Sequence, residues 1–136
     1  MTGPSRDYDQ YLTAQLDKAV RTAGSRGAAV VLLTAAYTHR AERPDGSLYS
    51  EDQPQRVDAW NDLLRAEAAR QPGKITLLDL NKVVCPGGKF TWSVDGRRIR
   101  SDGLHYTPVG VQRIIAPWLL PKLAATAEGT YRASSP

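Results

Sequence analysis

Hydrophobic residues recur at helical spacing in three parts of the chain. The first stripe lies within residues 8–23, the second within residues 57–68, and the third begins near Pro108. Each repeats every three or four residues, which predicts a helix with one apolar face turned toward a core. We expect the third helix to bury four apolar side chains: Val111, Ile114, Ile115 and Trp118.

The ends of these helices carry recognisable signals. Asp52 is the expected N-cap of the second helix and Thr107 that of the third, with Pro54 and Pro108 in the respective first turns. We expect the prolines within the third stripe to kink or end that helix, because proline lacks an N–H donor. They are Pro117 and Pro121.

Two apolar runs have no helical period. Residues 28–34, rich in valine and leucine, are typical of a strand buried on both faces, and residues 75–80 predict a second strand. A short hairpin is expected around Asp95 and Gly96. The alternation of helices and strands predicts an α/β fold, a parallel sheet with flanking helices. Two parallel strands form a small sheet, so we expect an exposed apolar edge covered by a partner chain, a swapped dimer or a further N-terminal segment.

Length and composition describe one ordinary globular unit. The chain has 136 residues, of which 41% are hydrophobic and 24% charged, enough for one core. We expect a disordered tail over residues 1–6, one domain over 7–127 and a frayed tail over 128–136.

Charge and targeting signals indicate neither a nucleic-acid site nor a membrane span. The net charge is +4, and the only basic cluster is Arg97-Arg98 with Arg100, which we interpret as a solvated hairpin rim and not a nucleic-acid site. No apolar run has the length of a membrane span, so membrane insertion is not expected. No signal-peptide core is present, which makes a cytoplasmic location the default and leaves the compartment open. Cys85 is the single cysteine and is interpreted as structural.

An acid and a base stand three residues apart just before the third helix. Asp102 and His105 flank Gly103 and Leu104, and a turn at the glycine can bring the two side chains together. A carboxylate that holds one ring nitrogen of an imidazole fixes its tautomer, so that the other nitrogen can act as a general base. The spacing therefore favours hydrolytic or acyl-transfer chemistry.

Two other interpretations of this pair stay open. The first is a surface aspartate beside a helix start, with a half-buried histidine. The second is a metal site, because both residue types are ligands. His39 is the only other histidine, and no paired-histidine, paired-cysteine or calcium-loop spacing accompanies the pair, so no metal is expected.

Four further residues are candidates for contact with a substrate. Tyr37 and His39 follow the strand 28–34, at the edge of the sheet where ligands bind in α/β folds. Arg100 and Tyr106 flank the acid–base pair. Each has a plainer alternative: solvation for His39, anchoring of the loop through a carboxylate for Arg100, and packing beneath the loop for Tyr106.

The segment 94–110 resembles the last conserved block of the SGNH hydrolases, whose pattern is approximately D-G-x-x-x-R-x-D-G-x-H-Y/F-T before a helix. It is most similar to the C-terminal SGNH domains of membrane acyltransferases. Residues 27–34, Arg56 with Trp60-Asn61, and residues 77–86 resemble earlier family segments in the right order, over residues 8–123. The resemblance implies a flavodoxin-like SGNH hydrolase fold, with Asp102 as the triad acid and His105 as the base.

The family's serine lies in a Gly-Asp-Ser block, and its oxyanion hole uses a glycine and an asparagine from two further blocks. No serine of this chain stands in such a setting. We therefore expect the chain to begin after the third block, with the fold incomplete and the nucleophile absent.

The resemblance implies an SGNH-type ester hydrolase or O-acyl (acetyl) transferase unit that needs no metal or organic cofactor. The implied substrate is an acyl ester or an O-acetylated carbohydrate. The alternative is a non-catalytic remnant that acts as a binding or assembly module. One half of a split enzyme, completed by a partner chain, would reconcile the two.

Overall fold

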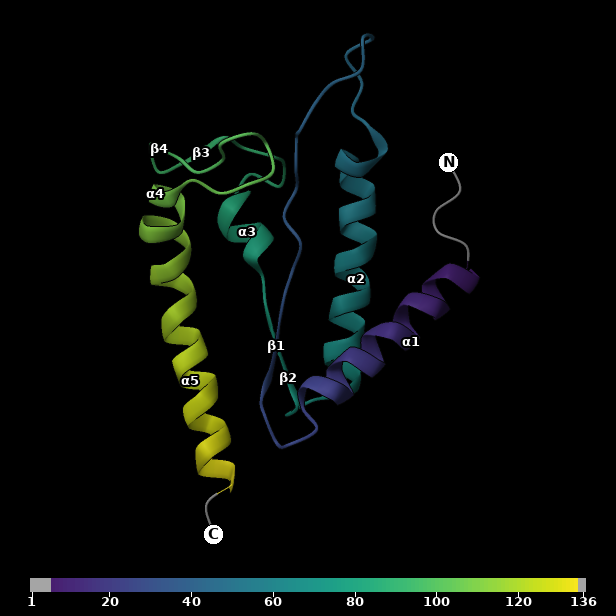
Figure 1. Ribbon diagram of the computed structural model, residues 1–136, viewed down its shortest axis with the longest axis vertical. Coiled ribbons are helices and arrows are strands. Elements are labelled where there is room, and N and C mark those ends of the chain that lie inside the picture. Colours follow the sequence, from purple (N-terminus) through teal and green to yellow (C-terminus); the bar gives the residue numbers. More distant parts are fainter. Residues whose placement is uncertain (1–5, 135–136) are drawn as a thin grey trace.

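The computed structural model describes the backbone of residues 6–134 and the side chains of residues 6–129. The predicted helices, strands and hairpin are present in the predicted order, and two short helices that were not predicted, Ser50–Asp52 and Leu80–Val84, lie between them (Figure 1). The helices are α1 (Arg6–Ala23), α2 (Pro54–Arg70), α3 (Leu80–Val84), α4 (Pro108–Gly110) and α5 (Ala116–Ser134). The strands are β1 (Val30–Leu33), β2 (Ile75–Leu78), β3 (Ser93–Val94) and β4 (Arg97–Arg98).

The parallel sheet consists of β1 and β2, paired from Val30 opposite Ile75 to Leu33 opposite Leu78. Figure 1 shows these strands nearly edge-on, with α5 on one side and α1 and α2 on the other. The predicted α/β architecture of a parallel sheet with flanking helices is thereby confirmed. The β3–β4 hairpin is antiparallel and turns at Asp95 and Gly96, both with positive φ, as the sequence predicted.

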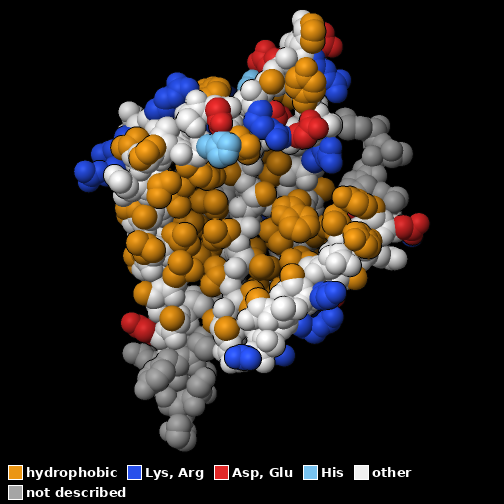
Figure 2. Space-filling model, viewed as in Figure 1, with side chains coloured by type: hydrophobic (Ala, Val, Ile, Leu, Met, Phe, Trp, Pro, Cys, Tyr) orange, Lys and Arg blue, Asp and Glu red, His pale blue; other side chains and the backbone are white. Residues whose placement is uncertain are grey.

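The prediction that the first strand is buried on both faces is wrong. β1 contains no buried residue, whereas both ends of β2 are buried, and Leu33 is 37% exposed. In the described part of the chain β1 pairs with β2 alone, so no strand lies along its other edge there. Hydrophobic side chains occupy much of the surface between α5 and α1 (Figure 2).

The buried apolar residues form two clusters. One lies where α1, α2 and β2 meet and contains Leu16, Val20, Leu64 and Ile75. The other packs under the hairpin and the start of the last helix and contains Tyr37, Val84, Cys85, Ile99 and Ile115. The second cluster supports the loop that carries the acid–base pair.

Asp52 does not cap α2, contrary to the prediction. Gln53 occupies the cap position without a side-chain bond. The buried Asp52 carboxylate instead accepts hydrogen bonds from the Thr38 hydroxyl at 2.6 Å and from the backbone N–H and Nε–H of Arg40, at 2.8 and 2.9 Å. Burial disfavours its charge, but these bonds outweigh burial and hold the pKa of Asp52 below its usual value. The carboxylate therefore stabilises the loop after β1.

The terminal helices are longer than predicted. α1 begins at Arg6, within the expected tail, because Asp7 and Asp9 favour a helix start. α5 continues to Ser134, through most of the predicted frayed tail, where Glu128, Arg132 and Ala133 favour a helix. The expected tail residues 1–5 and 135–136 lie outside the described residues.

Neither proline ends the last helix. Residues Val111–Ile115 form a π-helical segment that precedes Pro117, and Pro121 lies within α5. A π-helical turn contains one more residue than an α-turn and can absorb the missing N–H of a following proline. Of the four side chains expected to be buried here, Ile115 is buried, Ile114 and Trp118 are partly buried, and Val111 is 43% exposed.

Candidate functional site

Polar side chains join the segments that follow the two parallel strands. The buried hydroxyl of Thr34, after β1, donates to Asp79 Oδ1 at 2.9 Å and accepts from the backbone N–H of Asn81 at 3.0 Å. Asn81 Oδ1 accepts from the backbone N–H of Tyr37 at 3.0 Å. On the other side, the buried amide of Asn61 bonds both the N–H and the C=O of Ala35. These bonds hold the loop after β1 in place beside β2 and α2.

The acid–base pair forms as the spacing predicted. His105 Nδ1 lies 2.7 Å from Asp102 Oδ2, while Asp102 Oδ1 accepts from the backbone N–H groups of Leu104 and His105 at 2.9 and 2.8 Å. The turn closes through the Ser101 N–H, which donates to the His105 carbonyl at 3.0 Å. Thr107 then caps α4 by accepting from the Gly110 N–H. The pair therefore sits in the loop just before the last helix.

This geometry determines which imidazole nitrogen is available. The hydrogen bond from His105 and those from the two backbone N–H groups hold the pKa of Asp102 well below its ordinary value, so the carboxylate is charged near neutral pH and can only accept. Nδ1 of a neutral His105 must then carry the ring proton, which leaves the Nε2 lone pair free. The His105 side chain is 72% exposed, so this lone pair is open to a reactant.

Gly103 brings the turn against the segment that follows β1. Its φ is +82°, and a Cβ at this position would lie 1.9 Å from the His39 carbonyl oxygen. The Gly103 carbonyl accepts from the His39 N–H at 2.9 Å. The glycine thus provides both the turn and the close contact between the two backbones.

Tyr37 and His39 meet the turn and its supports through their backbones, while their side chains have other partners. Tyr37 is buried, and its hydroxyl donates to Asp58 at 2.6 Å, a bond that raises the Tyr37 pKa. The half-buried His39 ring bonds Glu42 at 3.0 Å and lies 5.5 Å from the Phe90 ring. The structure brings the backbone of His39, and not its ring, into hydrogen-bond contact with the turn.

Arg100 and Tyr106 pack beneath the turn. Arg100 is 1% exposed and donates from Nη1 to the Leu104 carbonyl at 2.8 Å and from Nη2 to the Tyr37 carbonyl at 3.0 Å. Its guanidinium carbon lies 4.4 Å from the centre of the Tyr106 ring. Burial raises the pKa of Tyr106. Arg100 anchors the loop through carbonyl groups, where the sequence suggested a carboxylate.

No nucleophile contacts the His105 ring within residues 6–129. Ser101 Oγ lies 3.4 Å from the His105 carbonyl and makes no bond to the imidazole. Cys85 is 2% exposed, and burial raises the pKa of its thiol, which suits a packing role. Among the described residues, no three His, Cys, Asp or Glu side chains are grouped to hold a metal ion.

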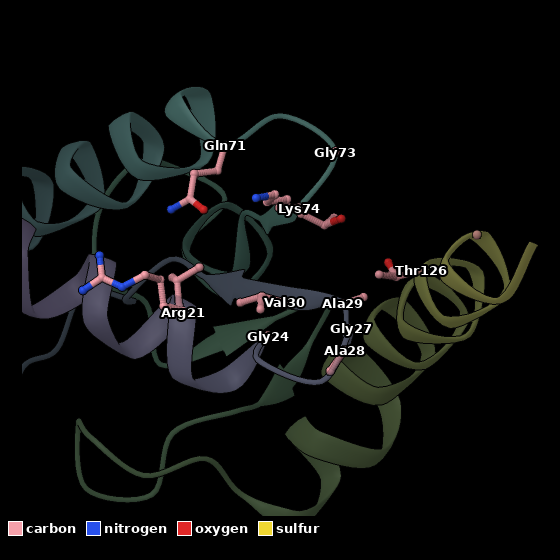
Figure 3. A pocket seen from close by; sticks show the side chains of 13 residues that line it. Arg21, Gly24, Gly27, Ala28, Ala29, Val30, Gln71, Gly73, Lys74 and Thr126 are labelled. Atoms are coloured by element: carbon pink, nitrogen blue, oxygen red, sulfur yellow. The ribbon is translucent and has the colours of Figure 1, made fainter. Parts of the chain in front are cut away.

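A cavity of about 750 Å³ lies at the opposite end of the sheet from the acid–base pair. Val30 and Thr76, at the amino ends of the strands, line it together with residues of α1 and α5. Figure 3 shows Arg21, Gln71 and Lys74 among the residues that line it. None of the candidate site residues belongs to its lining. The cavity is therefore separate from the proposed chemistry.

Sequence reasoning missed Thr34, Asn61 and Asn81 as supports of the site. Thr34 and Asp79 each directly follow a strand, and polar residues in that position were the signal that could have indicated the carboxyl-end network. Asn61 stands among the apolar residues of the second helical stripe, which is the pattern of a buried polar residue with a structural partner.

No helix in the described part of the chain is both long and apolar enough to cross a membrane. Comparison of this chain with protein-family models, curated proteins and solved structures found no match. The resemblance to the SGNH hydrolases therefore rests on the residues of the sequence alone, and family membership stays a prediction.

Proposed function

We propose that this chain is the acid–base unit of an SGNH-type ester hydrolase or O-acyl (acetyl) transferase. The observation that carries the proposal is the 2.7 Å contact between His105 Nδ1 and Asp102 Oδ2, with Oδ1 held by two backbone N–H groups and Nε2 facing solvent. An aspartate ordered in this way orients an imidazole and stabilises its protonated form. The family and the class of substrate, an acyl ester or an O-acetylated carbohydrate, are inferred from the resemblance of residues 94–110 to the SGNH motif.

In the proposed reaction, His105 first accepts a proton from the attacking hydroxyl and then donates it to the leaving group. His105 Nε2 takes the proton of a hydroxyl group as its oxygen bonds the ester carbonyl carbon. The resulting imidazolium is stabilised by Asp102. When the tetrahedral intermediate collapses, the bond to the leaving alkoxide breaks and Nε2–H returns the proton to it. A water molecule, or the hydroxyl of an acceptor, then removes the acyl group by the same steps.

We propose that the attacking hydroxyl comes from a second polypeptide that adds a strand to the outer edge of β1. The N–H groups of Val30 and Thr34 donate toward β2, so by alternation those of Val31 and Leu33 face away from it. An added strand would pair with such groups, and helices that expose apolar residues, α1 and α5, lie on either side of the sheet (Figures 1 and 2). The exposed apolar residues on these elements include Tyr11, Leu33, Leu120 and Leu123.

This edge predicts self-association or dye binding by the isolated chain. We expect 8-anilinonaphthalene-1-sulfonate fluorescence to rise on binding, and Leu120→Lys to lower that rise at least twofold. Val109→Lys, which changes another exposed apolar residue, on α4, is the matched control. A compact monomer that binds no dye would contradict the proposed docking edge.

The catalytic proposal is tested with p-nitrophenyl acetate as substrate. The chain is assayed alone and after coexpression with the polypeptide encoded immediately upstream, with a fluorophosphonate probe to label an activated serine. We expect little turnover by the chain alone and hydrolysis by the pair that His105→Ala abolishes. His39→Ala measures the background, because any accessible imidazole hydrolyses this ester slowly and His39 is the only other histidine. Equal rates for His105→Ala and the unchanged pair would overturn the proposal.

A second candidate function is a non-catalytic binding or assembly module. It is favoured by the absence, in the described residues, of a nucleophile beside His105 and by the open edge of β1. The same assay separates the two functions. A stable complex that hydrolyses no ester and leaves the fluorophosphonate probe unreacted would support the binding module.

A further inference from the structure

Arg100 is a buried cation without an ion-pair partner among the described residues. Its terminal nitrogens bond two carbonyl oxygens, and its Nε is buried without a hydrogen-bond partner. The aromatic groups beside the charge are the rings of Tyr106 and Phe90, whose centres lie 4.4 and 5.6 Å from the guanidinium carbon. A buried charge of this kind is costly, so its place in the core indicates a specific task.

The two carbonyls belong to the two segments that meet at the candidate site. Leu104 stands inside the acid–base turn, and Tyr37 follows β1, 63 residues from Arg100 in sequence. We propose that Arg100 is a positioning residue that fixes the acid–base turn to the carboxyl end of β1. That this attachment serves catalysis rests on the proposed function. The attachment itself consists of the two Arg100 hydrogen bonds.

The bonds within the turn and the bonds that attach it are separate. Within the described part of the chain, the hydrogen bonds of the Asp102 carboxylate go to Leu104 and His105, both within three residues, so the acid–base contact can form without Arg100. The attachment to the β1 segment consists of the Arg100 bond to Tyr37 and the His39 N–H donated to Gly103. Loss of Arg100 should therefore loosen the turn as a whole and leave the imidazole correctly bonded.

Amide hydrogen exchange and imidazole ¹⁵N shifts measure these two properties independently. In Arg100→Met we expect exchange of the His39 N–H to accelerate at least tenfold. The Thr34 N–H, which donates to Leu78 within the sheet, should keep its protection, and the ¹⁵N shifts of His105 should keep the Nδ1–H tautomer. Asp102→Asn should give the opposite pattern, a changed tautomer with a protected His39 N–H.

Two further variants sharpen the test. Arg100→Lys keeps a charge but not the planar fork that reaches both carbonyls, so an intermediate exchange rate is expected at His39. Arg97→Met, in the exposed strand β4 three residues before Arg100, should change neither the exchange rate of His39 nor the ¹⁵N shifts of His105. Unaltered His39 exchange in both Arg100 variants would overturn the proposal, as would an equal loss of protection at His39 and Thr34, which indicates general support of the fold. These readouts need no turnover, so they stand even if the esterase proposal fails.

Discussion

Asp102→Asn is expected to lower ester hydrolysis by the completed enzyme roughly 10³- to 10⁴-fold. The cause is the wrong tautomer of His105. Two backbone N–H groups bond Oδ1 of Asp102, so an asparagine would keep its oxygen there and direct its NH₂ group at Nδ1. Nδ1 would then have to accept, the ring proton would move to Nε2, and the lone pair that removes the substrate proton would be lost.

The tautomer itself can be measured on the chain alone. Imidazole ¹⁵N shifts near neutral pH should show Nδ1–H in the unchanged protein and Nε2–H in Asp102→Asn. Asp95→Asn is the matched control, because Asp95 lies in the hairpin turn with φ 51°, a conformation that asparagine tolerates. Unchanged shifts in Asp102→Asn, or activity within tenfold of the unchanged enzyme, would contradict the assigned role of the carboxylate.

Gly103→Ala is expected to lower the free energy of unfolding by about 3 kcal/mol or more. Any L-residue is strained at φ +82°, and the added Cβ would overlap the His39 carbonyl oxygen. Because the backbone fixes the position of a Cβ and the other atom is a backbone oxygen, no side-chain rotation can relieve the overlap. The turn must move away from His39, which also breaks the His39 N–H bond to Gly103.

A urea titration followed by circular dichroism measures this loss, with Gly88→Ala as the control. Gly88 has nearly the same φ, +76°, but a Cβ added there would meet no atom within 4 Å. Its substitution should therefore cost only the backbone strain, about 1 kcal/mol. Equal losses in the two variants would show that the contact between the turn and His39 contributes nothing to stability.

The parts of the fold that could be predicted are those set by local pattern. The periodic apolar stripes of α1 and α2, the hairpin at Asp95 and the cap at Thr107 involve residues close in sequence, and all are present. The acid–base contact was predictable for the same reason, since its two residues are three apart. α3 was missed because its five residues have no visible period, and its first residue, Leu80, was assigned to the second strand although Asp79 caps the helix.

The parts that could not be predicted depend on contacts between distant segments. Asp52 looks like a helix cap until Thr38 and Arg40, which precede it by 14 and 12 residues, are seen to surround its carboxylate. The two partners of Arg100 are backbone carbonyl oxygens. Every residue has one, so the sequence does not indicate which residues Arg100 bonds. The exposure of β1 likewise depends on which strands lie beside it, and the apolar composition of the strand carries no such information.

The π-helical segment Val111–Ile115 also sets the direction of everything that follows it. An α-helix turns by about 100° per residue, so the extra residue of the wide turn rotates the whole of α5 by that amount relative to α4. Deleting one residue here would rotate Leu120 and Leu123, now exposed on α5, by about a quarter turn or more around the helix axis. A local irregularity next to the acid–base turn thus determines which way the leucines of the last helix face.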